Sequence, residues 1–329
     1  MKKALLKYIC SPGTGNPLEL EADEVRGEEI ISGQLIDRRT GNQYPIIGGI
    51  PRFITPEEMR GNYTSSFDEE WLKFNWLRDE DSREFEAITD KRLPDFKNKA
   101  VLDAGCGGGR VARFLAERSG LYIGIDYSIA CEKAYALCSH LPNTHFMQAD
   151  LNNLPFPSGP LVDFIFCYGV LHHTPEPALT FRNLPPLLRG GGELYVMVYR
   201  KPFFMLGMSD HFFRGVINKM PFRLQDSISG LMTGLQRLPW PSFWKRFFWF
   251  SLQKNAEYAK FCNYDWYTPQ YHFEFRVEEV MDWFQKSGFE GIKYINAWPY
   301  APPGEKYRLP RFKDSFRLGQ ILGVIGRKS

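Results

Sequence analysis

The segment Val101–Arg110 constrains the fold of this 329-residue chain more than any other. Its apolar start stops at Asp103 and is followed by glycines at 105, 107 and 109. Glycine adopts left-handed backbone conformations and lets N–H groups approach a ligand without a Cβ in the way. A helix N-terminus behind such a loop adds partial positive charge. The pattern predicts a strand, loop and helix that bind a ligand with a carboxylate or phosphate end.

The glycine spacing distinguishes two classes of cofactor-binding loop. A dinucleotide fingerprint needs glycine at the first, third and sixth positions, but the sixth position counted from Gly105 is Arg110. The spacing therefore disfavours a nicotinamide or flavin cofactor. An acid at Asp103 followed by three alternating glycines resembles the first motif of class I S-adenosylmethionine-dependent methyltransferases. Taken alone, the loop is also compatible with an ordinary tight turn.

Four later segments follow in the order that this resemblance requires. The run 121–125 ends at Asp126, a third short strand ends at Asp150, a fourth opens into a loop at Tyr168, and a β-branched and aromatic strand covers 193–199. An acid at the tip of the second strand of a doubly wound sheet accepts hydrogen bonds from ribose hydroxyls. Each acid alone also has a structural interpretation, but their order favours a binding core.

The resemblance covers residues 99–199 closely and implies S-adenosylmethionine as the cofactor. The positions that it implies for cofactor binding are Asp103, Gly105, Cys106 and Gly107 at the methionine end, Asp126 with Tyr127 at the ribose, Asp150 and Leu151 at the adenine, and Tyr168 near the sulfonium.

The expected architecture is α/β, a doubly wound, seven-stranded, Rossmann-like methyltransferase sheet with an antiparallel last strand. A small N-terminal β module and a helical insert complete it. The expected parts are a ribbon-like β module at 1–54, a helical cover at 55–98, the cofactor-binding core at 99–200, an aromatic and basic insert at 201–262, and a C-terminal part at 263–329 that completes the sheet.

The first part resembles a zinc-ribbon-like module that partners tRNA and protein methyltransferases and is also fused to bacterial ones. In that family, two Cys-x-x-Cys pairs usually hold zinc. Here Cys10 alone remains, and Asp37 and Thr40 stand where the second pair is expected. Because tetrahedral zinc needs about four nitrogen or sulfur ligands, we expect no metal in this module.

The second part is rich in acidic and aromatic residues. Phe67, Trp71 and Phe74 recur at helical spacing, which favours core packing. The functional alternative is a helical cover over cofactor and substrate, in which Tyr63 and Trp71 are the residues to test.

The insert combines eight basic and two acidic residues between 200 and 250 with a run of aromatic side chains at 240–250. Three interpretations remain: a helical insert packed on the sheet, a lid over an apolar substrate pocket, and a basic amphipathic helix in peripheral contact with a membrane surface.

The last part carries the pattern of the final hairpin of the fold. A helix is predicted at 276–287, followed by strands at 289–295 and 318–325. Before them, the segment 265–271 resembles one that recurs in bacterial members, where further histidines commonly follow. Phe273 and Phe275 occupy those places, so His272 alone remains. The predicted substrate residues are Trp71, Asp265, Tyr267, Tyr271 and His272.

Two adjacent histidines are the candidate catalytic residues. His172 and His173 follow the fourth strand, at the edge where open α/β sheets bind ligands. Histidine has a pKa suited to removing a proton from an oxygen or nitrogen nucleophile. The alternative is that they only cap the loop. No metal is expected in the reaction.

Composition limits the partners. The formal net charge is only +3, so there is no overall polyanion-binding signal. The six cysteines form no Cys-x-x-Cys pair, and the N-terminus lacks an apolar signal stretch, which favours a cytoplasmic protein with free thiols. The loop after the fourth strand lacks the signatures of base methylation, so nucleic acid is a secondary alternative.

These observations favour a methyltransferase that acts on an oxygen, nitrogen or carbon atom of a small-molecule or lipid- or saccharide-linked acceptor. RNA or protein methylation is the second interpretation. A scaffold that binds the cofactor without turnover is the third, because a binding core shows competence for binding and not for transfer.

Overall fold

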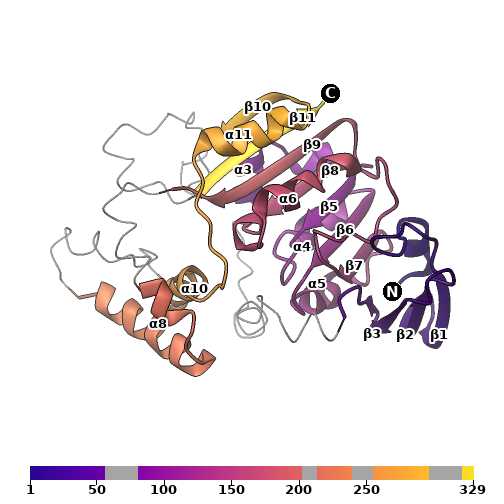
Figure 1. The fold of residues 1–329 in the computed structure, drawn as a ribbon, viewed down its shortest axis with the longest axis horizontal. Helices are drawn as coiled ribbons and strands as arrows, with labels where there is room; N and C mark the ends of the chain where they lie inside the picture. Colours follow the sequence, from indigo (N-terminus) through magenta and orange to yellow (C-terminus); the bar gives the residue numbers. More distant parts are fainter. Residues whose placement is uncertain (56–80, 202–212, 239–254, 296–320) are drawn as a thin grey trace.

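The computed structural model describes residues 1–55, 81–201, 213–238, 255–295 and 321–329 (Figure 1). Three sequence predictions lie outside these residues: the cover residues Tyr63 and Trp71, and the aromatic run 240–250.

A seven-stranded sheet forms the centre of the described structure. Its order is β10-β11-β9-β8-β5-β6-β7. The five strands from β5 to β9 pair in parallel, whereas β11 runs antiparallel to both β9 and β10. This confirms the predicted doubly wound fold and its antiparallel last strand. The bounds are β5 Ala100–Ala104, β6 Leu121–Asp126, β7 Thr144–Gln148, β8 Val162–Tyr168, β9 Leu188–Tyr199, β10 Phe289–Ile295 and β11 Ile321–Lys328.

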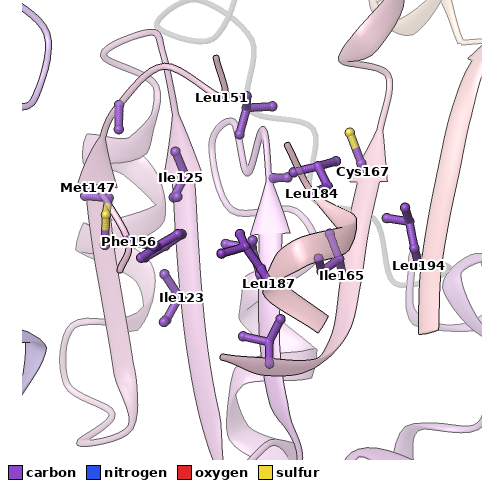
Figure 2. Close-up of a cluster of buried hydrophobic side chains, with 14 of the residues drawn as sticks. Ile123, Ile125, Met147, Leu151, Phe156, Ile165, Cys167, Leu184, Leu187 and Leu194 are labelled. Carbon is purple, nitrogen blue, oxygen red and sulfur yellow. The ribbon is translucent and has the colours of Figure 1, made fainter. Parts of the chain in front are cut away.

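Alternate residues of the central strands pack into two separate apolar clusters. Leu102, Ile123 and Ile165 belong to one cluster, while their neighbours Val101 and Tyr122 belong to the other. The side-chain period of two along a strand places these sets on opposite faces of the sheet. Figure 2 shows the first cluster, in which strand residues meet leucines of the segment that precedes β9.

Helices and short 3-10 turns connect the strands. The predicted helix at 276–287 is confirmed as α11, which buries Val280 and Phe284. The helices with their 3-10 turns are η1 Lys3–Lys7, α3 Asp81–Thr89, η2 Leu93–Phe96, α4 Ala112–Leu115, η3 Ala116–Arg118, α5 Cys131–Cys138, η4 Leu171–His173, α6 Pro177–Arg182, η5 Pro185–Leu187, α8 Phe222–Gln236, α10 Ala256–Tyr267 and α11 Val277–Lys286.

The helix behind the glycine loop differs from the prediction. The loop is followed by α4, which has only four residues and continues as the 3-10 turn η3. The buried side is as expected, with Val111, Phe114 and Leu115 in the core. However, a single turn aligns few peptide dipoles, so the expected positive charge at the helix N-terminus is small.

Phe85 of α3 packs the second part of the chain, 55–98, against the core. This ring is fully buried and lies within 5.0–6.5 Å, centroid to centroid, of Phe96, Phe114, Phe164 and Phe166. Aromatic pairs at these separations stabilise a core beyond their buried area. In the described portion of this part, aromatic side chains therefore pack against the sheet.

The insert contributes two helices that pack on each other. Lys260 of α10 pairs with Asp226 of α8 at 2.8 Å, and Asn263 Nδ2 donates to Thr233 Oγ1 at 3.0 Å. The pair lies at the opposite end of the molecule from the N-terminus (Figure 1). Tyr199, at the end of β9, joins the apolar cluster of this insert.

The N-terminal residues form the predicted β module. Four antiparallel strands pair in chain order. Its last residues join the core at the free side of β7, where Arg52 makes a parallel bridge to Gln148 and the Phe53 N–H donates to the Gln148 carbonyl at 2.8 Å. The strands are β1 Glu19–Arg26, β2 Glu29–Ile36, β3 Gln43–Ile47 and β4 Ile50–Pro51.

One buried carboxylate connects the two loops of this module. Asp37 accepts hydrogen bonds from the side chains of Thr14 (3.1 Å) and Asn16 (3.1 Å) in the first loop and from the N–H groups of Arg39 (3.0 Å) and Thr40 (3.3 Å) in its own loop. Burial opposes its ionisation, but hydrogen bonds from Thr40 and Asn16 outweigh it and hold the pKa of this carboxyl well below its ordinary 3.8.

We predict that Asp37→Ala lowers the thermal midpoint of the protein at pH 7, because it removes the acceptor of the hydrogen bonds that connect the two loops of the module. A lowered pKa in the folded state stabilises the protein above the unfolded pKa, near 3.8, and this contribution is lost as the pH falls further. The difference from wild type should therefore shrink in acid. Thermal unfolding at pH 7 and pH 3 measures both effects.

Asp23→Ala, on an exposed position of β1, is the matched control and should leave the midpoint unchanged. Equal midpoints for Asp37→Ala and wild type at pH 7 would contradict the role given to this carboxylate.

Candidate functional site

The candidate site lies at the carboxyl ends of β5, β6 and β8. Parallel pairing brings these ends to one edge of the sheet, because β5 lies between β6 and β8. The loop after β5 contains the three predicted glycines, all with positive φ: +87° at Gly105, +49° at Gly107 and +85° at Gly109. Left-handed conformations of this kind strain any residue with a Cβ.

Two of these glycines are required by contacts within the protein. A Cβ on Gly105 would lie 2.1 Å from Val170 Cγ2, in the loop after β8. A Cβ on Gly109 would lie 2.8 Å from the Ala134 Cα in α5. The glycines thus allow neighbouring loops and helices to approach the loop after β5.

Three backbone N–H groups of this loop donate to the end of β6, whereas the sequence predicted that they face a ligand. Those of Gly105 and Cys106 both donate to the Ile125 carbonyl, at 2.8 and 2.9 Å. The Gly107 N–H donates to Asp126 Oδ2 at 2.7 Å. The prediction that these donors bind a ligand directly is therefore wrong for this conformation, because the end of β6 accepts all three.

Asp103 is a buried acid beside the loop. Its side chain is 3% exposed, and Tyr122 donates a 2.5 Å hydrogen bond to its Oδ2. Burial raises the pKa of the Asp103 carboxyl to about 7, against the opposing hydrogen bond from Tyr122. A cationic group nearby would favour its ionised form.

Asp126 ends β6 with its carboxylate fixed from both sides. Oδ2 accepts from Gly107, and Oδ1 accepts from the Ser128 N–H at 2.9 Å and the Ser128 hydroxyl at 2.5 Å. Burial raises its pKa, against these hydrogen bonds. An ionised carboxylate offers about four acceptor positions, so the three protein donors leave capacity for a ligand hydroxyl.

The predicted adenine residues lie in the turn after β7. Asp150 Oδ1 accepts from the Asn152 N–H at 2.8 Å, which orders the turn. The Leu151 side chain is buried, and its carbonyl accepts from Asn183 Nδ2 at 3.0 Å. Tyr127, half-buried, offers its carbonyl to Gln148 Nε2 at 2.8 Å.

Tyr168 ends β8 in a ring stack. It lies parallel to Phe166 with centroids 5.7 Å apart, and the Arg110 guanidinium lies 5.0 Å from its ring centre. Its hydroxyl donates to Glu84 Oε1 at 3.5 Å. Cys106 is buried, which raises the pKa of its thiol well above the ordinary value, so this cysteine is not an activated nucleophile.

Carboxylates at three neighbouring strand ends define the kind of ligand that fits. Asp103, Asp126 and Asp150 offer acceptors and negative charge, which suit a ligand with hydroxyl, amine and cationic groups and would repel a phosphate. S-adenosylmethionine has ribose hydroxyls, an ammonium and a sulfonium, and these groups fit the three carboxylates. Of the two ligand ends that the sequence predicted, a carboxylate or a phosphate, S-adenosylmethionine carries the carboxylate.

The predicted catalytic and substrate residues come together in one buried cluster. His172 and His173 lie with ring centroids 4.1 Å apart, and His272 lies 6.0 Å from His173. The Tyr199 ring lies tilted against His172, with centroids 3.8 Å apart, and its centroid is 4.8 Å from that of His272. His272 is therefore one of three histidines in space, although it is isolated in its own segment.

A backbone contact fixes the tautomer of His173. Its Nδ1 lies 2.8 Å from the Tyr271 carbonyl. A carbonyl only accepts hydrogen bonds, so Nδ1 carries the proton and Nε2 holds the lone pair. Burial lowers the pKa of His173 to about 3 and that of His172 well below its ordinary value. Both rings are therefore neutral at physiological pH.

Of the other predicted substrate residues, Trp71 lies outside the described residues, whereas Asp265 and Tyr271 contact this cluster. Asp265 accepts a 2.6 Å hydrogen bond from the Tyr199 hydroxyl, and burial raises the pKa of its carboxyl. Tyr267 is buried in the apolar cluster of the insert. Tyr271 contributes its carbonyl to His173.

Sequence reasoning missed three members of the cluster. Tyr199 ends β9, Trp266 lies 4.6 Å from the Tyr199 ring, and the Arg214 guanidinium donates to the Trp266 carbonyl. The position of Tyr199 at the carboxyl end of a parallel strand was an available signal. Within the described ranges, no group of three His, Cys, Asp or Glu side chains could hold a metal ion.

Comparison with known proteins identifies the core of the site. Residues 102–196 match a family model described as "Methyltransferase domain". This segment extends from β5 into β9 and includes Asp103, Asp126 and the two adjacent histidines. The match confirms the predicted methyltransferase domain and its S-adenosylmethionine cofactor.

Two curated relatives match about a third of this chain. The chain is 27% identical over 127 residues to the ubiquinone biosynthesis O-methyltransferase of Acinetobacter baumannii (strain AYE), which is 38% of this chain and 48% of that protein. It is 32% identical over 110 residues to the protein of the same name from Coxiella burnetii (strain Dugway 5J108-111). That match covers 32% of this chain and 46% of the Coxiella protein. The chain thus spans about half the length of the curated relatives it matches.

Among solved structures, magnesium protoporphyrin IX methyltransferase from Synechocystis PCC 6803 with bound SAH has a TM-score of 0.44 and 17% identity, over 84% of this chain and 100% of that chain.

Among the helices in the described parts of the chain, none has the length and apolar character to cross a membrane.

We predict that Gly105→Ala destabilises the protein by about 2–4 kcal/mol, because it combines a left-handed backbone with a Cβ that overlaps Val170. The comparison variant is Gly27→Ala, where φ is also positive but nothing lies within 4 Å of the added Cβ. That change should cost about 1 kcal/mol. Denaturant unfolding compares the two, and equal costs would refute the packing explanation.

Proposed function

We propose that this chain is an S-adenosylmethionine-dependent methyltransferase that methylates a small-molecule acceptor. The observation that carries the proposal is the adjacency, on one sheet edge, of the three strand-end carboxylates and the buried cluster of His172, His173 and His272. The core relatives named as O-methyltransferases favour an oxygen acceptor, so hydroxyl compounds are the first acceptors to test.

The carboxylates hold the cofactor in this proposal. Asp126 accepts hydrogen bonds from the ribose hydroxyls, and Asp150 with Leu151 faces the adenine. Asp103 and the loop of Gly105, Cys106 and Gly107 surround the methionine end, with Tyr127 beside the ribose and Tyr168 near the sulfonium. The cofactor supplies a methyl group that is already activated by its sulfonium. The protein therefore mainly orients the acceptor and excludes water.

The histidine cluster receives the acceptor. The loop after β8, which packs Val170 against Gly105, continues directly into His172 and His173. His173 is the better candidate for the general base, because the Tyr271 carbonyl accepts from its Nδ1–H and the basic lone pair of the neutral ring is therefore on Nε2. Asp265, Tyr267, Tyr271 and His272 then shape the acceptor side.

The low pKa of His173 is compatible with a modest base. It keeps the ring neutral, and thus able to accept a proton, near neutral pH. A base with so low a pKa gives little driving force for full proton transfer. An acidic hydroxyl, such as that of a phenol, is therefore a better acceptor than an aliphatic alcohol.

The N-terminal module is a metal-free scaffold in this proposal. Asp37 stands where the zinc-ribbon resemblance expects a ligand, but its carboxylate oxygens already accept hydrogen bonds from both loops. Those donors would have to be displaced before the carboxylate could coordinate a cation.

We predict that Asp126→Ala weakens the binding of S-adenosylhomocysteine by about ten- to a hundredfold, because it removes a charged acceptor for a ribose hydroxyl. Isothermal titration calorimetry of the purified protein measures the dissociation constant. Asp282→Ala, an exposed acid of α11 paired with Lys286, is the control and should bind as wild type does. Wild-type protein that gives no binding heat would overturn the proposed function.

We predict that His173→Asn leaves S-adenosylhomocysteine binding unchanged and lowers turnover by about 10²–10⁴-fold, the usual contribution of a positioned base. Turnover is followed as S-adenosylhomocysteine released with a panel of phenolic and aliphatic hydroxyl acceptors. His140→Asn, at an exposed position, is the matched control. Full activity of His173→Asn would remove this residue from the reaction.

A further inference from the structure

One arginine of the N-terminal module reaches into the cofactor-binding core. Arg52 is only 7% exposed, and its guanidinium donates to Gln148 Oε1 at 3.1 Å and to Glu132 Oε1 at 2.6 Å. It also contacts Cys131 Sγ at 3.9 Å. These partners belong to two elements of the core, the end of β7 and the start of α5.

Gln148 lies directly beside the proposed ribose-binding acid. It is 1% exposed and pairs in register with Asp126 across the β6 and β7 ladder. Its Nε2 donates to the Tyr127 carbonyl at 2.8 Å. The Gln148 amide therefore connects Arg52 of the module to the residue that follows Asp126.

The chemistry of arginine determines which way this amide faces. A guanidinium carries only donors, so it requires the amide oxygen of Gln148 on its own side. The amide nitrogen is then directed to the Tyr127 carbonyl, which can only accept. Without Arg52, the amide oxygen loses its donor, and the Gln148 side chain is held from one side only.

The same arginine also holds the other end of the turn between β6 and α5. Glu132 is in the first turn of α5, and Cys131 Sγ donates to the Ser128 carbonyl at 3.5 Å. Ser128 in turn donates two hydrogen bonds to Asp126. Arg52 thus contacts both the strand beside the Asp126 turn and the helix that follows it.

We propose that Arg52 is a positioning residue for cofactor binding, which acts through Gln148 to hold the turn of Asp126 and Tyr127 in the conformation that receives the ribose. This inference rests on the proposed function. It assigns to the N-terminal module a part in cofactor affinity, in addition to its place in the fold.

The competing explanation is that Arg52 only fastens the module to the core. The two explanations predict different results for Gln148→Glu. The glutamate keeps an acceptor for Arg52, so the module stays attached, but it replaces the donor to Tyr127 by an oxygen. A positioning role predicts weaker cofactor binding in this variant. A fastening role predicts that the variant binds the cofactor as tightly as wild type does.

The test titrates S-adenosylhomocysteine into full-length wild type, Arg52→Met and Gln148→Glu by isothermal titration calorimetry. The expected result is a dissociation constant raised about tenfold in both variants, with the stoichiometry unchanged. Arg38→Met is the matched control, because this arginine is exposed on the same module and pairs only with Glu19 and Glu21 among the described contacts. It should bind as wild type does.

Three outcomes would decide against the positioning role. A lower stoichiometry with an unchanged dissociation constant in Arg52→Met would mean loss of folded protein alone. Wild-type affinity in Gln148→Glu would mean that the hydrogen bond to Tyr127 does not matter. Equal weakening in Arg38→Met would mean a general effect of the module. Absence of binding by wild type would instead count against the proposed function.

Discussion

The Ile125 carbonyl oxygen organises this protein, because it accepts the N–H groups of both Gly105 and Cys106. Two consecutive donors can reach one acceptor only if the chain turns sharply after β5, and Gly105 makes this turn with a φ of +87°. The turn brings the loop to the end of β6, where Asp126 accepts the next N–H group, that of Gly107. The acids of two parallel strands are thereby held next to each other.

The type of the elements and their order along the chain could be predicted because they depend on local patterns. The apolar runs that end at acids mark β5, β6 and β7, and the amphipathic period with Gly288 past its end marks α11. The three acids were predicted for the same reason, since parallel strands place their carboxyl ends on one edge. The sequence therefore predicted which acids gather at this edge of the sheet, whereas the direction of the loop N–H groups differs from the prediction.

The histidine cluster depended on information that local patterns do not contain. Whether His272 meets His173 depends on the path of the intervening chain, and the contact between His173 and Tyr271 spans 98 positions. The position of Arg52 beside Gln148, 96 positions away, depends in the same way on how the module packs on the core. Periodicity and spacing assign residues to elements, but they do not determine which distant side chains share a buried space.

The attachment of the N-terminal module to β7 also has a consequence for the association state of the chain. β7 is the last strand of the seven-stranded sheet, and a bare edge strand exposes backbone donors and acceptors that invite pairing with another chain. The bridge of Arg52 to Gln148 and the N–H of Phe53 cover the end of that edge. The module thus covers part of one sheet edge, and a shortened chain that begins at the core would expose the end of β7 to pairing with another chain.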